Sequence, residues 1–228
     1  MTVILAGGSG GLGSAAANLL AADFDLVISY KSNAERAQKL ANLGRIVQAD
    51  LLNQEDRRKL LDTPDLYGLV VFTGDPARIP DFEGAARRSF EANFFGPIQL
   101  AREAADRMKS AGTQGAIVLI STMQAIALFP GSTAYASQKA ALTHSAQILA
   151  KECRGKTNIR VNVICPGVNQ AGMAEASIAS GKYARYIDEG IIPRYGRAED
   201  VARAVRFFLE PDNYITGQVL TIDGGLTL

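Results

Sequence analysis

Tyr135 and Lys139 lie four residues apart in the segment YASQK, at the start of a long Ala-rich stretch that favours a helix. Residues with this spacing lie on one face of a helix, so the phenol and the ammonium can meet. A free tyrosine loses its proton only near pH ~10, and a fixed neighbouring cation lowers that pKa. We therefore expect Tyr135 to donate and accept protons in catalysis. The alternative is an unrelated surface tyrosine and surface lysine.

A glycine-rich turn, AGGSGGLG, follows strand-like residues at the N-terminus and precedes a helical pattern. Glycine lets the backbone turn tightly and approach a pyrophosphate, which then meets the free N–H groups of the helix N-terminus. Such turns also serve structure alone, and the spacing GxxxGxG differs from the commoner GxGxxG. The position directly after a first strand favours dinucleotide binding. The candidate contacts in this turn are Gly7, Ser9, Gly11, Leu12 and Gly13.

The composition of the 228 residues limits the class of protein. A net charge of +1 without a polybasic run makes nucleic acid and anionic membranes poor partners. No apolar run reaches the roughly 20 residues that cross a bilayer, and the N-terminus has no secretory signal pattern. The two cysteines form no disulfide framework, so a reducing, cytoplasmic setting is the default. The single histidine, His144, excludes most His-based metal sites, and we expect no metal.

Short apolar runs alternate with helical patterns along the whole chain, from a strand at 3–6 to a last strand at 219–222. Such alternation predicts parallel pairing, so the expected fold is α/β, a Rossmann-type doubly wound parallel sheet. No repeat or linker divides the sequence, which predicts a single dinucleotide-binding catalytic domain over residues 1–228. The expected helices include 34–43, 83–109 (continuous or interrupted) and 134–152. A helical insertion around 168–193, with its helix at 173–189, is expected to cover the substrate.

Several motifs occur together in the order found in one enzyme family. With the glycine turn and YxxxK, the chain resembles the compact branch of the short-chain dehydrogenase/reductase family over essentially its whole length. GAIVLIST resembles the family's fifth strand and serine segment, and YITGQVLTIDGG resembles its closing strand. IRVNVICPG resembles the sixth strand and the turn at the nicotinamide end, which implies cofactor contacts at Pro166, Gly167 and Val168. Similar members include 3-oxoacyl-carrier-protein reductases and related carbonyl and sugar dehydrogenases.

The resemblance implies catalytic roles for four residues. Tyr135 would be the general acid in carbonyl reduction, and Lys139 would lower its pKa and bind the nicotinamide ribose. In the family, the hydroxyl that binds the substrate usually lies about 13 residues before the tyrosine in sequence, which is Thr122 here. Side chains of a strand alternate between its two faces, so the neighbouring Ser121 should point to the opposite face. Asn93 matches the family's asparagine, whose backbone carbonyl holds a relay water. Pro97 has no N–H to bond that carbonyl, and the alternative is a simple helix kink.

The chain departs from the family pattern after the fourth strand. The family's NNAG segment is replaced by VFTG at 71–74, which leaves Gly74 as the cofactor contact there. The threonine that opens the family's glycine turn is Ala6, and the threonine after the Pro-Gly turn is replaced near Ala171. None of these changes removes a proton-transfer group. They do make it unsafe to transfer a precise substrate from the family.

The residues after the second strand bear on the choice of cofactor. NAD users generally carry an acid there for the ribose 2′-hydroxyl, whereas this chain has Lys31 and Ser32. A lysine and a hydroxyl can bind a 2′-phosphate, which favours NADP(H) over NAD(H). The alternative is that Lys31 is a solvated lysine in a turn. Gly10 also argues against NADP(H), because many NADP users in the family have an arginine at this position of the glycine turn. Asp50 matches the family's contact to the adenine amino group, and we include the adjoining Leu51.

These features predict an NADP(H)-dependent oxidoreductase that transfers a hydride between nicotinamide and a carbonyl or alcohol substrate. A non-catalytic dinucleotide-binding regulator is one alternative, although such proteins commonly lose the Tyr/Lys pair that this chain retains. An isomerase or dehydratase on the same fold is another. Family members commonly pair through the two helices expected at 83–109 and 134–152, so we expect a homodimer or homotetramer.

Overall fold

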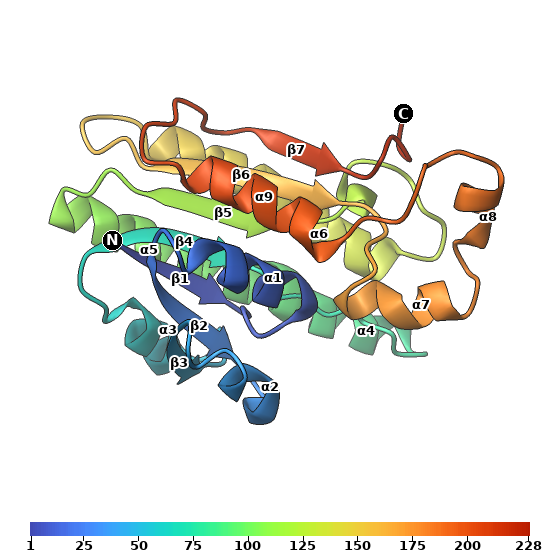
Figure 1. Ribbon diagram of the computed structural model, residues 1–228, viewed down its shortest axis with the longest axis horizontal. Helices are drawn as coiled ribbons and strands as arrows, with labels where there is room; N and C mark the ends of the chain where they lie inside the picture. The colour runs from blue at the N-terminus through green and yellow to red at the C-terminus, as the bar shows by residue number, and fades with distance from the viewer.

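The computed structural model describes residues 1–228 and is built on one sheet of seven parallel strands with helices on both faces (Figure 1). The sheet has the order β3-β2-β1-β4-β5-β6-β7. The strands are β1 (Thr2–Ala6), β2 (Asp25–Tyr30), β3 (Gly44–Gln48), β4 (Leu66–Val71), β5 (Ala116–Ile120), β6 (Arg160–Pro166) and β7 (Val219–Ile222). The α-helices are α1 (Gly11–Leu20), α2 (Ala34–Gln38), α3 (Gln54–Leu61), α4 (Phe82–Phe90), α5 (Gly96–Ala111), α6 (Thr133–Glu152), α7 (Glu175–Ala179), α8 (Ala184–Asp188) and α9 (Ala198–Leu209).

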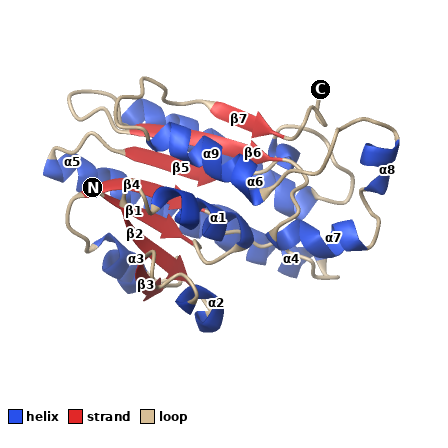
Figure 2. Ribbon diagram, in the orientation of Figure 1, coloured by secondary structure: helices blue, strands red, loops and turns tan.

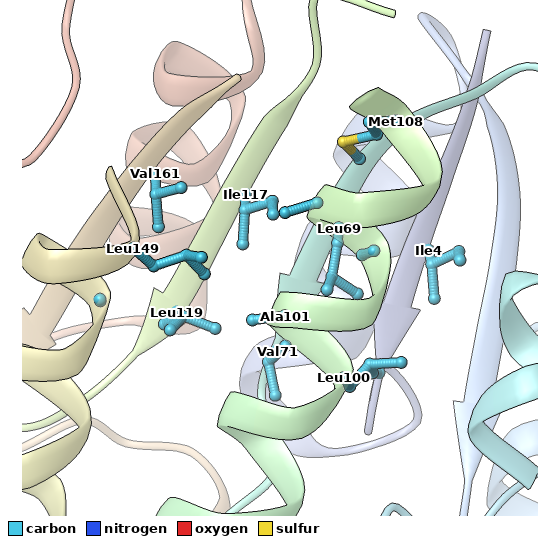
Figure 3. Packing of buried hydrophobic residues seen from close by; sticks show 14 of the residues in the cluster. Ile4, Leu69, Val71, Leu100, Ala101, Met108, Ile117, Leu119, Leu149 and Val161 are labelled. Carbon is cyan, nitrogen blue, oxygen red and sulfur yellow. The ribbon is translucent and has the colours of Figure 1, made fainter. Parts of the chain in front are cut away.

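The central strands are apolar along their whole length because both of their faces are covered. In β1, alternation sends Val3 and Leu5 to one face of the sheet and Ile4 to the other, and all three are fully buried. Figure 3 shows the core on the second side, where Leu100 of α5 packs with Ile4 and strand residues of β4 and β5. The first core lies under α1 and α9. The sequence prediction of a doubly wound parallel sheet is confirmed.

The sheet order places a crevice at the carboxyl ends of β1 and β4. The chain winds outward from β1 to β3 in one direction and from β4 to β7 in the other. Open parallel sheets bind ligands at such a switch point, because the loops on either side lead away from each other. Figure 2 shows that β5 and β6 point toward the end of the molecule where α7 and α8 lie.

Two expected helices differ from the structure near the start and middle of the chain. The helix expected at 34–43 stops at Gln38, and single tight turns then lead into β3. The long helix expected at 83–109 is interrupted by a π-helical turn, Glu91–Phe95, between α4 and α5. Pro97 cannot donate a helical hydrogen bond, and the turn before it widens so that Gly96 N–H bonds the carbonyl of Glu91. The interruption therefore follows from one missing N–H.

The insertion after β6 is also more broken than the sequence pattern predicts. Instead of one helix at 173–189, it forms a short 3-10 turn at Gly172–Ala174 followed by α7 and α8. Gly181, with φ of +75°, stands between the two helices and turns the chain where a residue with a side chain would be strained. None of the helices is both long and apolar enough to span a membrane.

Candidate active site

A cavity of about 1290 Å³ opens at the carboxyl ends of the strands and collects nearly all the predicted site residues. Its walls come from the glycine turn, the ends of β2 to β6, the start of α6 and the insertion. The predicted residues that line it are Gly7, Ser9, Gly11, Leu12, Gly13, Lys31, Ser32, Asp50, Leu51, Gly74, Thr122, Tyr135, Lys139, Pro166, Gly167 and Val168. Asn93 is the exception, because it lies fully buried behind the wall.

Three glycines of the turn, Gly8, Gly11 and Gly13, pack so closely against neighbouring atoms that they admit no side chain. A Cβ on Gly13 would lie 2.6 Å from the Cα of Gly8, which lets α1 begin directly against the turn. The hydroxyl of Ser29 in β2 accepts a hydrogen bond from Gly7 N–H at 3.0 Å and fixes the turn to the sheet. The sequence could not show this contact, because it joins residues 22 positions apart.

The first turn of α1 leaves hydrogen-bond donors free at the cavity. The backbone N–H groups of Gly11, Leu12 and Gly13 have no protein partner, and no side chain caps the helix. Free N–H groups and the helix dipole together favour an anion. This end of the cavity therefore fits the pyrophosphate of a dinucleotide.

The end of the cavity beside β2 and β3 carries the residues assigned to the adenosine half of a cofactor. Lys31 and Asp50 form an ion pair with 2.7 Å between Nζ and the carboxylate. Burial raises the pKa of Asp50, but hydrogen bonds from Lys31 and from Leu52 N–H outweigh it and leave the pKa below its ordinary value. The carboxylate is thus ionised at neutral pH. A second cation, Arg36, lines the same region without any carboxylate partner.

A buried ion pair supports the backbone beside Asp50. Arg57 of α3 is 6% exposed and forms a bidentate contact with Glu103 of α5, with N···O distances of 2.9 and 3.0 Å. The same guanidinium donates to the carbonyl of Leu51 at 2.7 Å. Removal of Glu103, which is partly exposed, would leave the charge of Arg57 buried and unpaired. The pair therefore holds the cavity wall at Leu51 in place, and no local sequence pattern indicated it because it joins residues 46 positions apart.

Tyr135 lies in the first turn of α6 and is partly exposed to the cavity. Burial of the phenol raises its pKa to about 12, while the neighbouring Thr122 hydroxyl acts in the opposite direction. The pKa of Tyr135 is thus raised and not lowered in this structure, and the predicted lowering by the Lys139 ammonium stays a prediction. The spacing places both residues on one helix, but it does not direct the ammonium to the phenol.

Lys139 instead points into the end of the sheet. It is 2% exposed, and Nζ donates to the carbonyls of Ile120 at 2.9 Å and Thr73 at 3.2 Å. An ammonium has three N–H donors, so one remains for another partner. Burial lowers the pKa of Lys139 to about 8. The charge of this lysine is thus sensitive to pH in a range where an exposed lysine stays protonated.

The pKa of Lys139 predicts an alkaline limit to activity. Because burial lowers this pKa from 10.5 to about 8, the ammonium is present below pH 8 and is lost as the pH rises through that value. We expect kcat/KM for the cofactor, which reports the free enzyme, to fall about tenfold per pH unit above it. Lys139→Arg serves as the control, since a guanidinium keeps its charge and should remove this fall even at a lower rate. A wild-type profile that stays flat to about pH 10 would exclude the assignment.

Asn93 and Gly74 meet behind the cavity wall. Asn93 Oδ1 accepts from the backbone N–H of Asp75 at 2.9 Å, and Nδ2 donates to the Asp75 carbonyl at 2.7 Å. A Cβ on Gly74 would lie 3.2 Å from Oδ1 of Asn93 and 3.4 Å from Nζ of Lys139. The side chain of Asn93 therefore clamps the loop after β4, next to the lysine. Sequence reasoning considered only its backbone carbonyl and missed this clamp.

The two adjacent hydroxyls after β5 have different surroundings. Ser121 Oγ donates to the Lys139 carbonyl at 3.1 Å and accepts from Thr143 Oγ1 at 2.8 Å, so it is engaged by α6. Thr122 Oγ1 accepts from Gln124 N–H at 3.3 Å, which leaves its own proton free to donate. Thr122 also lies close enough to Tyr135 to affect its pKa. The geometry thus gives Thr122 a free donor beside the phenol.

Asn169, which follows the Pro-Gly turn, is a further cavity residue that sequence reasoning missed. Its Nδ2 donates to the carbonyl of Gly167 at 2.9 Å, and its backbone pairs with Gly196. The side chain is 5% exposed and fills the space that a Cβ on Gly196 would need. Asn169 therefore fixes the turn of the nicotinamide end to the start of α9. The sequence does contain a signal for this role, which is a polar residue directly after the segment PGV at 166–168.

One cavity thus contains a phosphate-binding turn, a buried lysine, a phenol and a free hydroxyl. This combination is typical of an oxidoreductase that works with a nicotinamide dinucleotide. Comparison with known proteins supports this class. Residues 7–227 match the protein-family profile described as Enoyl-(Acyl carrier protein) reductase. Carbonyl reductase family member 4 of Danio rerio is 33% identical, over an alignment that covers 99% of this chain and 97% of that protein. The 3-oxoacyl-[acyl-carrier-protein] reductase of Rickettsia conorii is 30% identical, over an alignment that covers 100% of this chain and 97% of that protein.

Solved structures with bound cofactors resemble the chain as well. The 7α-hydroxysteroid dehydrogenase complexed with NADH and 7-oxo glycochenodeoxycholic acid has a TM-score of 0.88 and 27% identity, covering 98% of this chain and 93% of that chain. ElxO with NADP bound has a TM-score of 0.85 and 26% identity, and the match covers 99% of this chain and 98% of the ElxO chain. The chain belongs to the short-chain dehydrogenase/reductase family and is an oxidoreductase that uses a nicotinamide cofactor.

Proposed function

We propose that this enzyme is an NADP(H)-dependent carbonyl reductase that also oxidises the corresponding alcohol. The observation that carries the proposal is the meeting of Thr122, Tyr135 and Lys139 in the cavity that holds the free N–H groups of α1. The nicotinamide supplies or accepts the hydride when it is bound. The residues of the chain bind, orient and transfer the proton.

Tyr135 is the proton donor in the proposed reduction. A phenol with a pKa of about 12 stays protonated at neutral pH, which is the state that a general acid needs. The free proton of the Thr122 hydroxyl donates to the same carbonyl oxygen and stabilises the negative charge that develops on it. The remaining N–H of Lys139 would bind the ribose hydroxyls of the cofactor, and Asn93 keeps the loop beside this lysine in place.

The preference for NADP(H) rests on charge at the adenosine end. Lys31, Ser32 and Arg36 line the cavity there, and no acid stands at the end of β2 to repel a 2′-phosphate. Asp50 lies one strand further and is neutralised by its ion pair with Lys31. Among the similar structures, ElxO carries NADP and the hydroxysteroid dehydrogenase carries NADH, so the preference depends on the residues of this chain.

Lys31→Asp is predicted to change cofactor preference. The substitution places a carboxylate where the 2′-phosphate would bind, and it removes a charge-assisted hydrogen bond. We expect the Kd for NADPH to rise about 10- to 100-fold more than the Kd for NADH, measured by calorimetry. Lys39→Asp is the control, because Lys39 lies on the neighbouring C-cap of α2 and does not line the cavity. A wild type that already prefers NADH would refute the proposed role of Lys31.

A panel of ketones, aldehydes and alcohols tests the reaction itself. Each compound is offered with each reduced or oxidised cofactor, and the absorbance of the reduced nicotinamide is followed. Transfer of deuterium from labelled NADPH to the product carbon identifies a reduction and distinguishes it from isomerisation or dehydration. If NADPH binds but no carbonyl compound receives the label, the enzyme is not a carbonyl reductase.

The proposed assembly is a closed homodimer or homotetramer in the cytoplasm. Large apolar side chains lie exposed on α4, on the π-helical turn and on α6, where Phe82, Phe90, Phe95 and Ile148 are 36–64% exposed. Phe90 and Phe95 stack with 5.7 Å between ring centroids and so form one continuous patch. Such a patch indicates a protein interface. The unpaired thiols of Cys153 and Cys165 support the reducing compartment.

Light scattering at micromolar concentration is expected to give two or four times the chain mass of 24.3 kDa. The double variant Phe90→Ser/Phe95→Ser should shift the protein toward the monomer, because each change removes apolar area from the patch. Phe207→Ser is the control, because Phe207 lies on α9 over the opposite face of the sheet and is 43% exposed. A fully active monomer would contradict both the assembly and its link to activity.

A further inference from the structure

The insertion carries a cluster of two cations and two aromatic rings on the wall of the cavity. Tyr183 and Tyr186 stack with 6.1 Å between their ring centroids. Lys182 Nζ lies 5.6 Å from the centroid of Tyr183, and the guanidinium of Arg185 lies 5.1 Å from that of Tyr186. All four residues line the cavity that contains Tyr135. We call these four residues the lid cluster.

The positive charges of the lid cluster have no acidic partner. Neither Lys182 nor Arg185 forms an ion pair or a hydrogen bond to a carboxylate, and each is held by a ring face instead. Another cation of the cavity wall, Arg88 of α4, is different, because it is paired with Asp75 at 2.5 Å. Contact with an aromatic face orients a cation and removes part of its water while leaving its charge uncancelled.

The acids of the same region do not neutralise the lid cluster. The carboxylate of Glu175 accepts from Gly172 N–H at the base of the insertion, and Asp75 is engaged by Arg88. Glu91 lines the cavity from the π-helical turn and makes no ion pair with either cation. Asp188 and Glu189 follow on the same segment but do not line the cavity.

The lid cluster lies within reach of the reacting groups. Tyr183 is close enough to Tyr135 to raise the pKa of that phenol further, beyond the effect of burial. Arg78, in the loop after β4, donates to the carbonyl of Met173 at 3.2 Å and to Ser177 Oγ at 3.1 Å. This contact ties the insertion to the opposite wall. A substrate bound at Tyr135 therefore shares its cavity with Tyr183 and with the two cations held by the tyrosine rings.

We propose that Lys182 and Arg185 bind an anionic group of the substrate, a carboxylate or a phosphate, while its carbonyl faces Tyr135 and Thr122. The physiological substrate is then an anionic carbonyl compound. This inference rests on the proposed carbonyl reduction and names its substrate class. The flat faces of Tyr183 and Tyr186 hold the cations and cover the apolar part of the substrate between its two polar ends.

The test compares matched carbonyl compounds that differ only in charge. One arm uses methyl-ketone acids of increasing chain length, from acetoacetate upward, against their methyl esters. The other uses dihydroxyacetone phosphate against dihydroxyacetone. We expect the wild type to have a higher kcat/KM for the charged compound than for its neutral partner in one of the two arms. The arm with the larger ratio shows whether the anionic group of the substrate is a carboxylate or a phosphate. In Lys182→Gln/Arg185→Gln the ratio of charged to neutral kcat/KM should fall about 10- to 100-fold.

Two controls make the outcome specific. Lys156→Gln removes an exposed cation from the loop between α6 and β6, at the far end of the sheet, and should leave the ratio unchanged. Arg185→Glu should reverse the preference toward the neutral member. Equal ratios in the wild type and the double variant would overturn the assignment. If no carbonyl compound is reduced, the proposed function fails, and calorimetric binding of the acids to both proteins still decides whether the lid cluster binds anions.

Discussion

Tyr135→Phe is expected to lower kcat for carbonyl reduction by about 10²- to 10⁴-fold, the usual contribution of a general acid. The substitution removes only the phenolic oxygen, so α6 and the cavity wall keep their shape. No protein group nearby replaces the lost proton, because Lys139 is directed at the carbonyls of Ile120 and Thr73, and the Thr122 hydroxyl is too weak an acid to give its proton up. The Kd for NADPH should change little, since the free N–H groups of α1 and the cations at the adenosine end are untouched.

Single-turnover reduction and calorimetric cofactor binding separate these two effects. Tyr214→Phe is the matched control, because that phenol is 99% exposed, lies outside the cavity and should keep full activity. Turnover by Tyr135→Phe within a few-fold of the wild type would remove Tyr135 from the mechanism. Loss of cofactor binding together with activity would instead indicate a role in holding the nicotinamide end.

The fold could be predicted because its strongest signals are local. Strands such as β1 and β5 are short apolar runs, and their burial on both faces makes that pattern unavoidable. The ends of helices were less predictable. The π-helical turn before Pro97 depends on how the chain recovers from one missing N–H, and the pattern left an interruption open without giving its form.

The site was predictable in membership but less so in its contacts. Spacing predicted that Tyr135 and Lys139 share one helix, yet the ammonium is directed to Ile120 at the end of β5 and to Thr73 in the loop after β4. Lys31 and Asp50 were assigned separately to a cofactor, and the structure pairs them with each other. Partners across the sheet are set by packing, which a single sequence does not encode locally.

The same reasoning explains why the lid cluster was only partly foreseen. The aromatic and basic residues of the insertion are visible in the sequence as a mixture that suits an apolar or an anionic ligand. Their arrangement depends on the turn at Gly181, which separates α7 from α8 and places Lys182 and Tyr183 on the cavity wall. A continuous helix at 173–189 would also have gathered these four side chains on one side, so the turn decides which way that side faces.

Thr122→Ala is expected to lower kcat/KM for the carbonyl substrate by about 10²- to 10³-fold, whereas Ser121→Ala should keep most of it. The loss follows from the removal of a hydrogen-bond donor that is aimed at developing negative charge, for which this magnitude is typical. Ser121 has no such donor to offer, because its proton is directed to the carbonyl of Lys139. Its removal should act on stability instead, since the buried hydrogen bond from Ser121 to the Lys139 carbonyl would be lost, while Thr143 keeps that carbonyl as its acceptor at 2.9 Å.

Steady-state kinetics and thermal melting of both variants distinguish the two roles. Thr122→Ser is the decisive control, because it keeps the hydroxyl and removes only a methyl group, and it should restore activity to within a few-fold of the wild type. Ser121→Ala should melt at a lower temperature than the wild type, and Thr122→Ala should melt close to it, because the Thr122 hydroxyl accepts only one hydrogen bond at 3.3 Å. If Ser121→Ala were instead the inactive variant, the substrate oxygen would have to lie on the other side of β5, against α6.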